Sequence, residues 1–178
     1  MLMTETLVLG GGCFWCTHAV FKEVRGVREV ESGYCNGHTL APTYEEVCAG
    51  MTGHCEVIKL VYAPAQVSLQ DLLEVFFLIH DPTTLNRQGH DVGTQYRSGI
   101  YWTFPEQGEQ ARQLLRVWAA QGHWEQPVVT EIAPLANYQA AEDYHQDFFA
   151  KNPEQAYCLA MAAPKVAKFR QSLARLLK

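Results

Sequence analysis

Hydrophobic residues come in short groups that alternate between strand-like and helix-like spacing. Residues 4–9 alternate weakly, are rich in β-formers and end in a glycine triplet, which predicts a short buried strand leading into a tight turn. A helical stripe follows and Gly26 ends it, so Cys13 and Cys16 are predicted to share one face of an amphipathic helix. The stripe comprises Cys13, Cys16, Thr17, Val20, Phe21 and Val24.

The rest of the chain continues to mix the two periods. Strands are predicted over residues 27–34, 57–62, 99–104 and 126–134, and helices over 69–79, 105–121, 140–152 and 164–178. Residues 80–98 fit neither period and are long for an idle connection, so we expect this loop to be functional.

This mixture predicts the α+β fold class. We expect a two-layer α/β sandwich, in the form of a ferredoxin-like plait with additional helices and a long C-terminal segment. The length suits one domain, residues 1–178, and no repeat or linker interrupts it. The segment around residues 153–163 is rich in alanine and short on regular pattern, and we expect it to be mobile.

Charge and hydropathy exclude two classes of partner. The chain carries 14 Lys and Arg against 19 Asp and Glu, for a net charge of −5, so nucleic acid is not expected as a partner. The longest apolar run, residues 75–79, is far below a membrane span, and the N-terminal residues do not have the pattern of a secretory signal. We therefore expect a cytoplasmic protein, whose thiols are kept reduced.

The six cysteines are then better explained by metal binding or redox catalysis than by a disulfide framework. In "GGGCFWC", Cys13 stands at a predicted helix N-terminus, where the helix dipole should lower its pKa and make it a nucleophile, with at least one ring of Phe14 and Trp15 beside the sulfur. Cys48, in "YEEVCAG", is expected to be a small buried hydrophobe.

Two alternatives remain open for the Cys-x-x-Cys pair. It could serve a general dithiol-disulfide oxidoreductase that uses Cys13 and Cys16 alone. It could also be half of a zinc site, completed by Cys35 and His38 or by His54 and Cys55, in a zinc-binding interaction module.

Five blocks together resemble the A-type peptide methionine sulfoxide reductases: "GGCFWC", "TYEEVCAGMTGHCEV", "IHDPTTLNRQGHDVGTQYRSGIY", "AEDYHQDFF" and "APKVAKF". The resemblance implies an enzyme that reduces methionine-S-sulfoxide, free or in proteins, and that needs neither cofactor nor metal. It assigns Cys13 as the nucleophile that becomes a sulfenic acid, and Glu56 as a proton donor whose pKa burial should raise.

The same resemblance gives the remaining roles. Tyr44 and Tyr96 would hydrogen-bond the sulfoxide oxygen, and Asp91 would orient this group. Phe14 and Trp15 would receive the substrate methyl group. Cys16 and Cys158 are the resolving cysteines, with thioredoxin or a similar dithiol protein as the reductant.

Three places depart from the family pattern: Cys35, Cys55 and the run Tyr138, Gln139 and Ala140.

Overall fold

A computed structural model describes residues 3–178, so positions 1 and 2 of the predicted domain lie outside the described residues. Its centre is a six-stranded sheet in the order β7-β6-β1-β3-β2-β8. The strands are β1 (Glu5–Gly11), β2 (Val27–Cys35), β3 (Cys55–Tyr62), β6 (Ser98–Trp102), β7 (Glu131–Pro134) and β8 (Gln139–Ala140), and β4 (Arg87–Gln88) pairs with β5 (Asp91–Val92) in a separate hairpin. The helices are α1 (Phe14–Phe21), α2 (Tyr44–Cys48), α3 (Leu69–Ile79), α4 (Pro105–Ala120), α5 (Phe148–Lys151) and α6 (Ala163–Ser172).

The inner part of the sheet confirms the predicted plait. Strands β6, β1, β3 and β2 are antiparallel neighbours, α1 links β1 to β2, and α3 lies between β3 and β6 in the chain. β7 extends this sheet parallel to β6, and β8 extends it antiparallel to β2.

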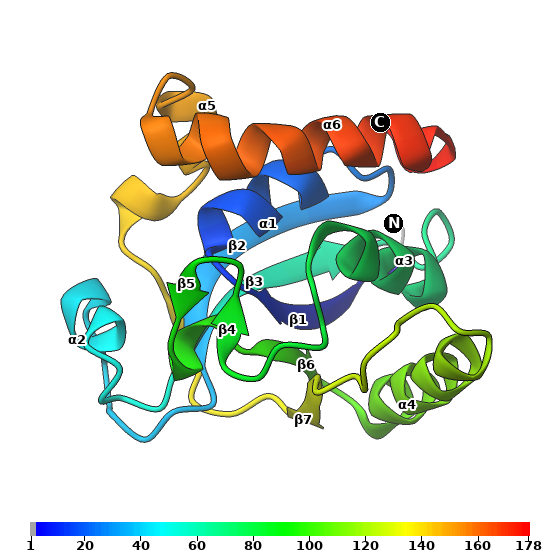
Figure 1. The fold of residues 1–178 in the computed structure, drawn as a ribbon, viewed down its shortest axis with the longest axis horizontal. Helices are drawn as coiled ribbons and strands as arrows, with labels where there is room; N and C mark the ends of the chain where they lie inside the picture. The colour runs from blue at the N-terminus through cyan, green and yellow to red at the C-terminus, as the bar shows by residue number, and fades with distance from the viewer. Residues whose placement is uncertain (1–2) are drawn as a thin grey trace.

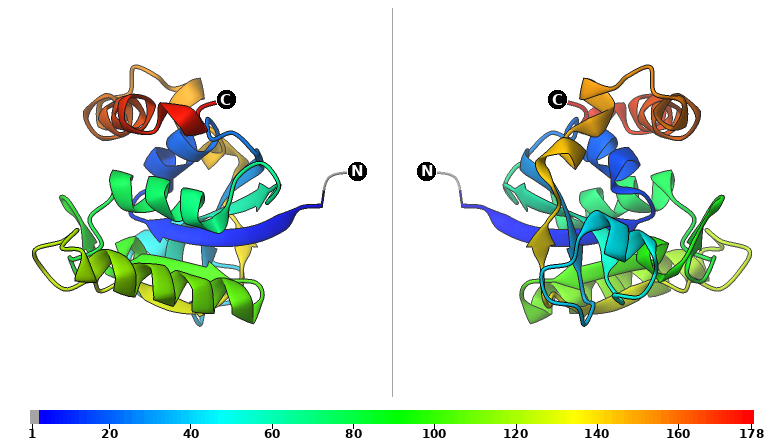
Figure 2. Two further views of the ribbon diagram at one scale, coloured as in Figure 1. Left: turned by 90° about the vertical axis from the view of Figure 1, so that its right-hand side faces the viewer. Right: turned by 90° about the vertical axis from the view of Figure 1, so that its left-hand side faces the viewer.

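Helix α1 lies in the middle of the molecule. In Figures 1 and 2, α6 crosses its outer side, so that α1 is sandwiched between the sheet and the C-terminal part of the chain. Seven of its eight residues are buried, and only Trp15 is partly exposed. The predicted amphipathic stripe is therefore wrong as a description of this helix, because α5 and α6 cover the side that would otherwise face water.

One further prediction differs from the structure. Residues 140–152 do not form one helix: they contain the end of β8, a 3-10 turn over Asp143–His145 and the short helix α5. Asp147 takes a left-handed backbone conformation, with φ of 53°, which separates the 3-10 turn from helix α5. The unpatterned loop 80–98 contains the β4–β5 hairpin and a 3-10 turn over Thr94–Tyr96.

Strand alternation sorts side chains onto the two faces of the sheet. On β3, Ile58, Leu60 and Tyr62 belong to the main core beneath α1 and α3, whereas Cys55 and Val57 belong to a smaller cluster on the other face. Residue 56 therefore points to the helix side. Within residues 3–178, no helix is long and apolar enough to cross a membrane.

Candidate active site

Three cysteines meet at the N-terminal end of α1. Cys13 is the residue that precedes the helix, and its carbonyl accepts a hydrogen bond from the Cys16 N–H at 3.1 Å. The thiols of Cys13 and Cys16 share a hydrogen bond, and Cys158 packs against Cys16 in the same cluster. The structure thus brings together the predicted nucleophile and both predicted resolving cysteines.

Gly12 makes this entry into the helix possible. Its φ is +90°, and a Cβ atom there would lie 2.7 Å from Cγ of Gln88. Both the backbone conformation and the close neighbour require glycine immediately before the nucleophile.

Cys158 belongs to a helix rather than to an irregular segment. The chain is helical from residue 156 to residue 172, with a π-helical turn over Cys158–Ala162. Cys158 and Ala162 are buried, and the Cys158 N–H is held by Oε1 of Gln155 at 2.9 Å. The mobility expected for residues 153–163 stays a prediction, and a π-turn inside a longer helix is a frequent feature of functional sites.

Glu56 lies beneath the start of α1. Its side chain is 1% exposed, and Oε1 accepts a hydrogen bond from the Phe14 N–H at 3.3 Å. Burial raises the pKa of Glu56 to about 8, as the sequence predicted. This carboxyl group is therefore protonated at neutral pH and can donate a proton.

The pKa of Cys13 does not follow the prediction. The hydrogen bond that the Cys13 thiol donates to Cys16, burial and the charge of Glu56 together raise the pKa of the Cys13 thiol well above its ordinary value. The hydrogen bond with Cys13 lowers the pKa of Cys16. At Cys13 the hydrogen bond to Cys16 and burial therefore outweigh the helix dipole on which the sequence argument relied.

Aromatic rings surround the cysteines, as the "CFW" run predicted. The Phe14 ring packs on His145 with centroids 5.0 Å apart and on Tyr44 at 6.4 Å. Trp15 stacks on Phe148 at 3.8 Å, and its Nε1–H donates to Nδ1 of His145 at 3.0 Å. These rings give the site an apolar wall.

Tyr44 and Tyr96 approach the same centre from two elements. Tyr44 begins α2, and Tyr96 ends the 3-10 turn before β6. Burial raises the pKa of both phenols, and the negative charges of Glu56 and Cys13 raise them further. Both phenols are therefore neutral hydrogen-bond donors near the carboxyl group and the sulfur.

Asp91 reaches the site from β5. Its Oδ2 accepts a hydrogen bond from the Tyr157 hydroxyl at 2.5 Å, and its charge also raises the pKa of Glu56. Asp91 thus joins the loop 80–98 to the helix that carries Cys158.

Four residues of the site were not singled out from the sequence. Tyr34 pairs with Glu56 across β2 and β3, and its hydroxyl donates to Oε1 of Glu142 at 2.8 Å. Oε2 of Glu142 accepts from the Tyr44 N–H at 3.0 Å, which fixes the start of α2. The others are His145 and Tyr157. Glu142 and His145 stand inside the quoted block "AEDYHQDFF", and Tyr157 directly precedes Cys158, so their places in the sequence were the available signal.

The remaining cysteines lie outside this cluster. Cys48 is exposed, so its interpretation as a buried hydrophobe is wrong: α2 is short, and only Val47 turns inward from it. Cys35 and Cys55 pair across β2 and β3 on the opposite face of the sheet from Glu56, where burial raises the pKa of Cys55 to about 12.

The zinc alternative finds no support in the part of the chain that the structure describes. Nε2 of His54 is engaged by the Thr39 carbonyl at 2.8 Å. No three side chains of His, Cys, Asp or Glu gather as metal ligands among residues 3–178.

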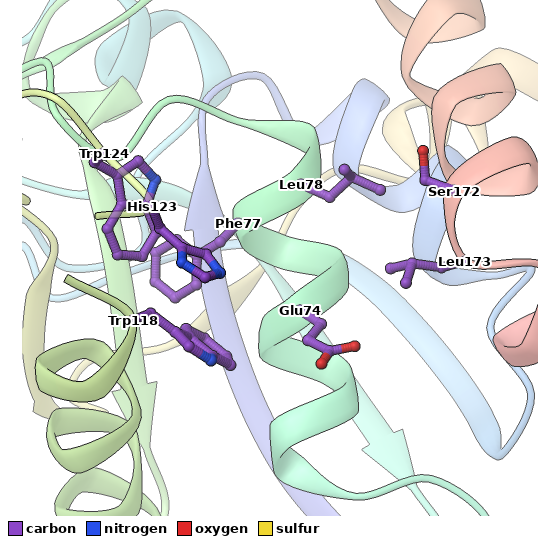
Figure 3. Close-up of a pocket in the computed structure, with 8 residues that line it drawn as sticks. All are labelled: Glu74, Phe77, Leu78, Trp118, His123, Trp124, Ser172 and Leu173. Carbon is purple, nitrogen blue, oxygen red and sulfur yellow. The ribbon is translucent and has the colours of Figure 1, made fainter. Parts of the chain in front are cut away.

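A groove of about 440 Å³ lies elsewhere, over the outer side of α3. Figure 3 shows Trp118, His123 and Trp124 on one side of this helix and Ser172 and Leu173 on the other. It contains no cysteine and shares no residue with the cysteine cluster, so we do not assign it to the reaction.

A cluster of thiols beside a protonated carboxyl group and neutral phenols is typical of the active site of a thiol-dependent redox enzyme. Comparisons with known proteins agree with this class. The family model described as peptide methionine sulfoxide reductase matches residues 5–176. The chain belongs to the peptide methionine sulfoxide reductase family, and to its A type, so it is an oxidoreductase that reduces methionine sulfoxide.

Individual relatives support the same conclusion. The peptide methionine sulfoxide reductase MsrA of Chromobacterium violaceum is 48% identical over 98% of this chain and 99% of its own length. The MsrA of Granulibacter bethesdensis is 52% identical over 96% of this chain and 92% of its own. The solved methionine sulfoxide reductase A of Corynebacterium diphtheriae superposes with a TM-score of 0.79 at 40% identity, over 85% of this chain and 76% of that one. Mxr1 of Saccharomyces cerevisiae, which is 24% identical in that comparison, has also been solved in complex with Trx2.

Proposed function

We propose that this enzyme reduces the S epimer of methionine sulfoxide, free or within proteins, with Cys13 as its nucleophile and Glu56 as its proton donor. The observation that carries this proposal is the position of Glu56: a buried carboxyl group with a pKa of about 8 directly beneath the helix start that holds Cys13. A sulfoxide oxygen is a poor leaving group, and a proton donor of this pKa is suited to neutral pH.

In the first step, the Cys13 thiolate attacks the sulfoxide sulfur. Because Cys13 and Cys16 share a hydrogen bond, Cys13 becomes the thiolate when the shared proton moves to Cys16. Glu56 gives its proton to the oxygen. The sulfur-sulfur bond formed by the attack and the sulfur-oxygen bond of the substrate then break as the hydroxyl group passes to Cys13, which becomes a sulfenic acid. Methionine leaves, reduced by the two electrons that Cys13 has lost.

The phenols and rings give this step its orientation. Tyr44 and Tyr96 donate hydrogen bonds to the sulfoxide oxygen, which gains negative charge as the bond breaks. Asp91 holds the loop that carries Tyr96. Phe14 and Trp15 receive the methyl group, so that the oxygen and the methyl group have separate places and one epimer is selected.

The oxidised enzyme is recycled by disulfide exchange that passes from Cys13 to Cys16 and then to Cys158, the order in which the three thiols lie in the site. The thiol of Cys16 is hydrogen-bonded to that of Cys13, and Cys158 packs on Cys16. Cys16 condenses with the sulfenic acid and releases water, and Cys158 then attacks the sulfur of Cys16, which frees Cys13. Thioredoxin or a similar dithiol protein reduces the final disulfide between Cys16 and Cys158. We place this cycle in the cytoplasm, where such reductants are abundant.

The test of the overall function uses a peptide that contains one methionine sulfoxide, prepared as separate S and R epimers. Incubated with the enzyme and dithiothreitol, the S peptide is expected to lose the mass of one oxygen while the R peptide stays unchanged. Conversion of the R peptide alone, or of neither, would contradict the proposal.

Removal of both resolving cysteines separates the two halves of the cycle. Cys16→Ser combined with Cys158→Ser is expected to release about one methionine per protein in the absence of added reductant, because Cys13 still accepts the oxygen. Steady turnover with thioredoxin should collapse. Cys35→Ala, on the far face of the sheet, is the matched control and should keep full turnover. Continued turnover of the double variant would show that neither cysteine resolves the sulfenic acid.

A further inference from the structure

Tyr96 lies on a short turn that its two neighbours in the chain fasten to the rest of the site. The turn Thr94–Tyr96 is a 3-10 element between β5 and β6, outside the paired strands. The proposed reaction needs the Tyr96 hydroxyl free for the substrate oxygen, so its position has to be set through the backbone of this turn. Gln95 and Arg97 stand on either side of Tyr96, and we call their side chains the two braces of the turn.

Arg97 joins three separate backbone segments with one guanidinium group. Its Nη1 donates to the carbonyl oxygens of Gly53 at 3.1 Å and Thr94 at 2.9 Å, and its Nη2 donates to that of Asn36 at 3.3 Å. Its Nε lies 3.6 Å from a carboxylate oxygen of Glu131, and the arginine side chain is only 13% exposed. The turn is thereby fastened to the end of β2 and to the chain that enters β3.

Gln95 fastens the same turn to helix α2. Its Nε2 donates to the carbonyl oxygen of Cys48 at 3.2 Å, and Cys48 is the last residue of the helix that Tyr44 begins. Gln95 is 4% exposed, and a Cβ atom at Gly93 would collide with its Oε1, so the chain closes tightly around this amide. This brace therefore links the turn of Tyr96 to the helix that carries the second phenol.

The two groups that would act together with Tyr96 are held by contacts of their own. Glu56 lies within the paired length of β3 and accepts a hydrogen bond from the backbone at the start of α1. Tyr44 is fixed by Glu142, whose carboxylate accepts from the Tyr44 backbone N–H. Loss of a brace would therefore displace Tyr96 relative to these two groups, while the groups themselves stay in place.

We propose that Arg97 and Gln95 are positioning residues that hold the Tyr96 hydroxyl in register with Glu56 and Tyr44, so that all three reach the same substrate oxygen. This inference rests on the proposed function and adds two residues that do not touch the substrate. A guanidinium group suits the position because its donors lie in one rigid plane, whereas a lysine ammonium has the charge without that fork. A displacement of about 1 Å at a reacting group can cost roughly 10²-fold in rate, so a small loss of alignment is measurable.

The experiment measures the first turnover at saturating methionine-S-sulfoxide by rapid quenching. Arg97→Lys keeps the charge and removes the fork. Methionine release should slow by about 10- to 100-fold while the substrate concentration at half-saturation changes little, because the hydrogen bond of Tyr96 strengthens in the transition state. Arg112→Lys is the matched control, since Arg112 also donates to a backbone carbonyl, that of Ile132 at 3.5 Å, and it should keep the rate of the parent.

A double-mutant cycle separates positioning from general damage to the fold. In a Tyr96→Phe background the hydroxyl that Arg97 positions is gone, so Arg97→Lys should cost less than about threefold. In a Tyr44→Phe background the full loss should remain, because Tyr44 is held independently. Thermal unfolding of each variant shows whether it is folded.

Gln95→Met tests the other brace. The methionine side chain keeps the length of glutamine but does not donate a hydrogen bond, so methionine release should slow in the parent and not in the Tyr96→Phe background. If Arg97→Lys does not fold, this second cycle decides the proposal, because both braces act on the same turn.

The rate of the parent in a folded Arg97→Lys or Gln95→Met protein would overturn the role of that residue. An equal loss in the Tyr96→Phe and Tyr44→Phe backgrounds would overturn the proposal for both. Absence of methionine release from the parent, or an unchanged rate in Tyr96→Phe alone, would instead refute the proposed function.

Discussion

Replacement of Cys13 by serine is expected to reduce methionine formation by more than about 10⁴-fold, the scale seen when an enzyme loses its nucleophile. A hydroxyl group does not ionise near neutral pH and cannot accept oxygen as a sulfenic acid. The measurement is methionine released from the S-epimer peptide with dithiothreitol present, so that recycling does not limit the rate.

The variant should fold normally, because serine is close to cysteine in size and Cys13 is only partly buried. Its thermal unfolding, compared with that of the parent, is the control. Substantial activity in a folded Cys13→Ser protein would remove Cys13 from the reaction.

Replacement of Glu56 by glutamine should lower the rate of the first turnover by about 10²- to 10⁴-fold, the contribution of a positioned general acid. The amide keeps the size and accepts the Phe14 N–H, but it has no acidic proton. In the parent, the first-turnover rate should fall as the pH rises through about 8, since the donor then loses its proton. Glu56→Gln should lack this fall. An unchanged first turnover in the variant would exclude Glu56 as the acid.

Stability provides an independent check on the same carboxyl group. Its pKa is raised from 4.5 to about 8 by burial, so its stabilising contribution is complete below pH 4.5 and is lost as the pH rises toward 8. In this window the free energy of unfolding of the parent should decrease, relative to Glu56→Gln, by up to about 1.4 kcal/mol per pH unit. Denaturant unfolding at several pH values measures the difference, and it also shows that the variant is folded.

Periodicity was sufficient for most of the sheet and for α3 and α4, because these elements have clear caps and one buried face. Ser68 makes a capping box with Asp71, and Pro105 opens α4, as their positions in the sequence predicted. Helix α1 was misinterpreted because burial on all sides depends on α6, which comes about 150 residues later in the chain. The spacing of apolar residues within α1 contains no information about a helix that packs on it from so far along the chain.

The active site, like the fold, was predictable where the signal lies in the local sequence and not where it depends on tertiary packing. The resemblance named Cys13, Glu56 and Cys158, and the fold places all three around the start of α1, while their roles stay predictions. The direction of the pKa change at Cys13 could not be obtained from a helix-start argument, because it depends on the contact with Cys16 and on burial beside Glu56. Tyr157 was missed because its place in the site arises from the packing of a π-helical turn against Cys16.

The central claim is that the sulfur of Cys13 takes the oxygen atom of the substrate. The most direct measurement uses methionine-S-sulfoxide labelled with the heavy isotope of oxygen and the protein that carries Cys16→Ser and Cys158→Ser. After one turnover, mass spectrometry should find the heavy oxygen on the peptide that contains Cys13. Methionine release with Cys13 unmodified, or with the label on another cysteine, would contradict the account.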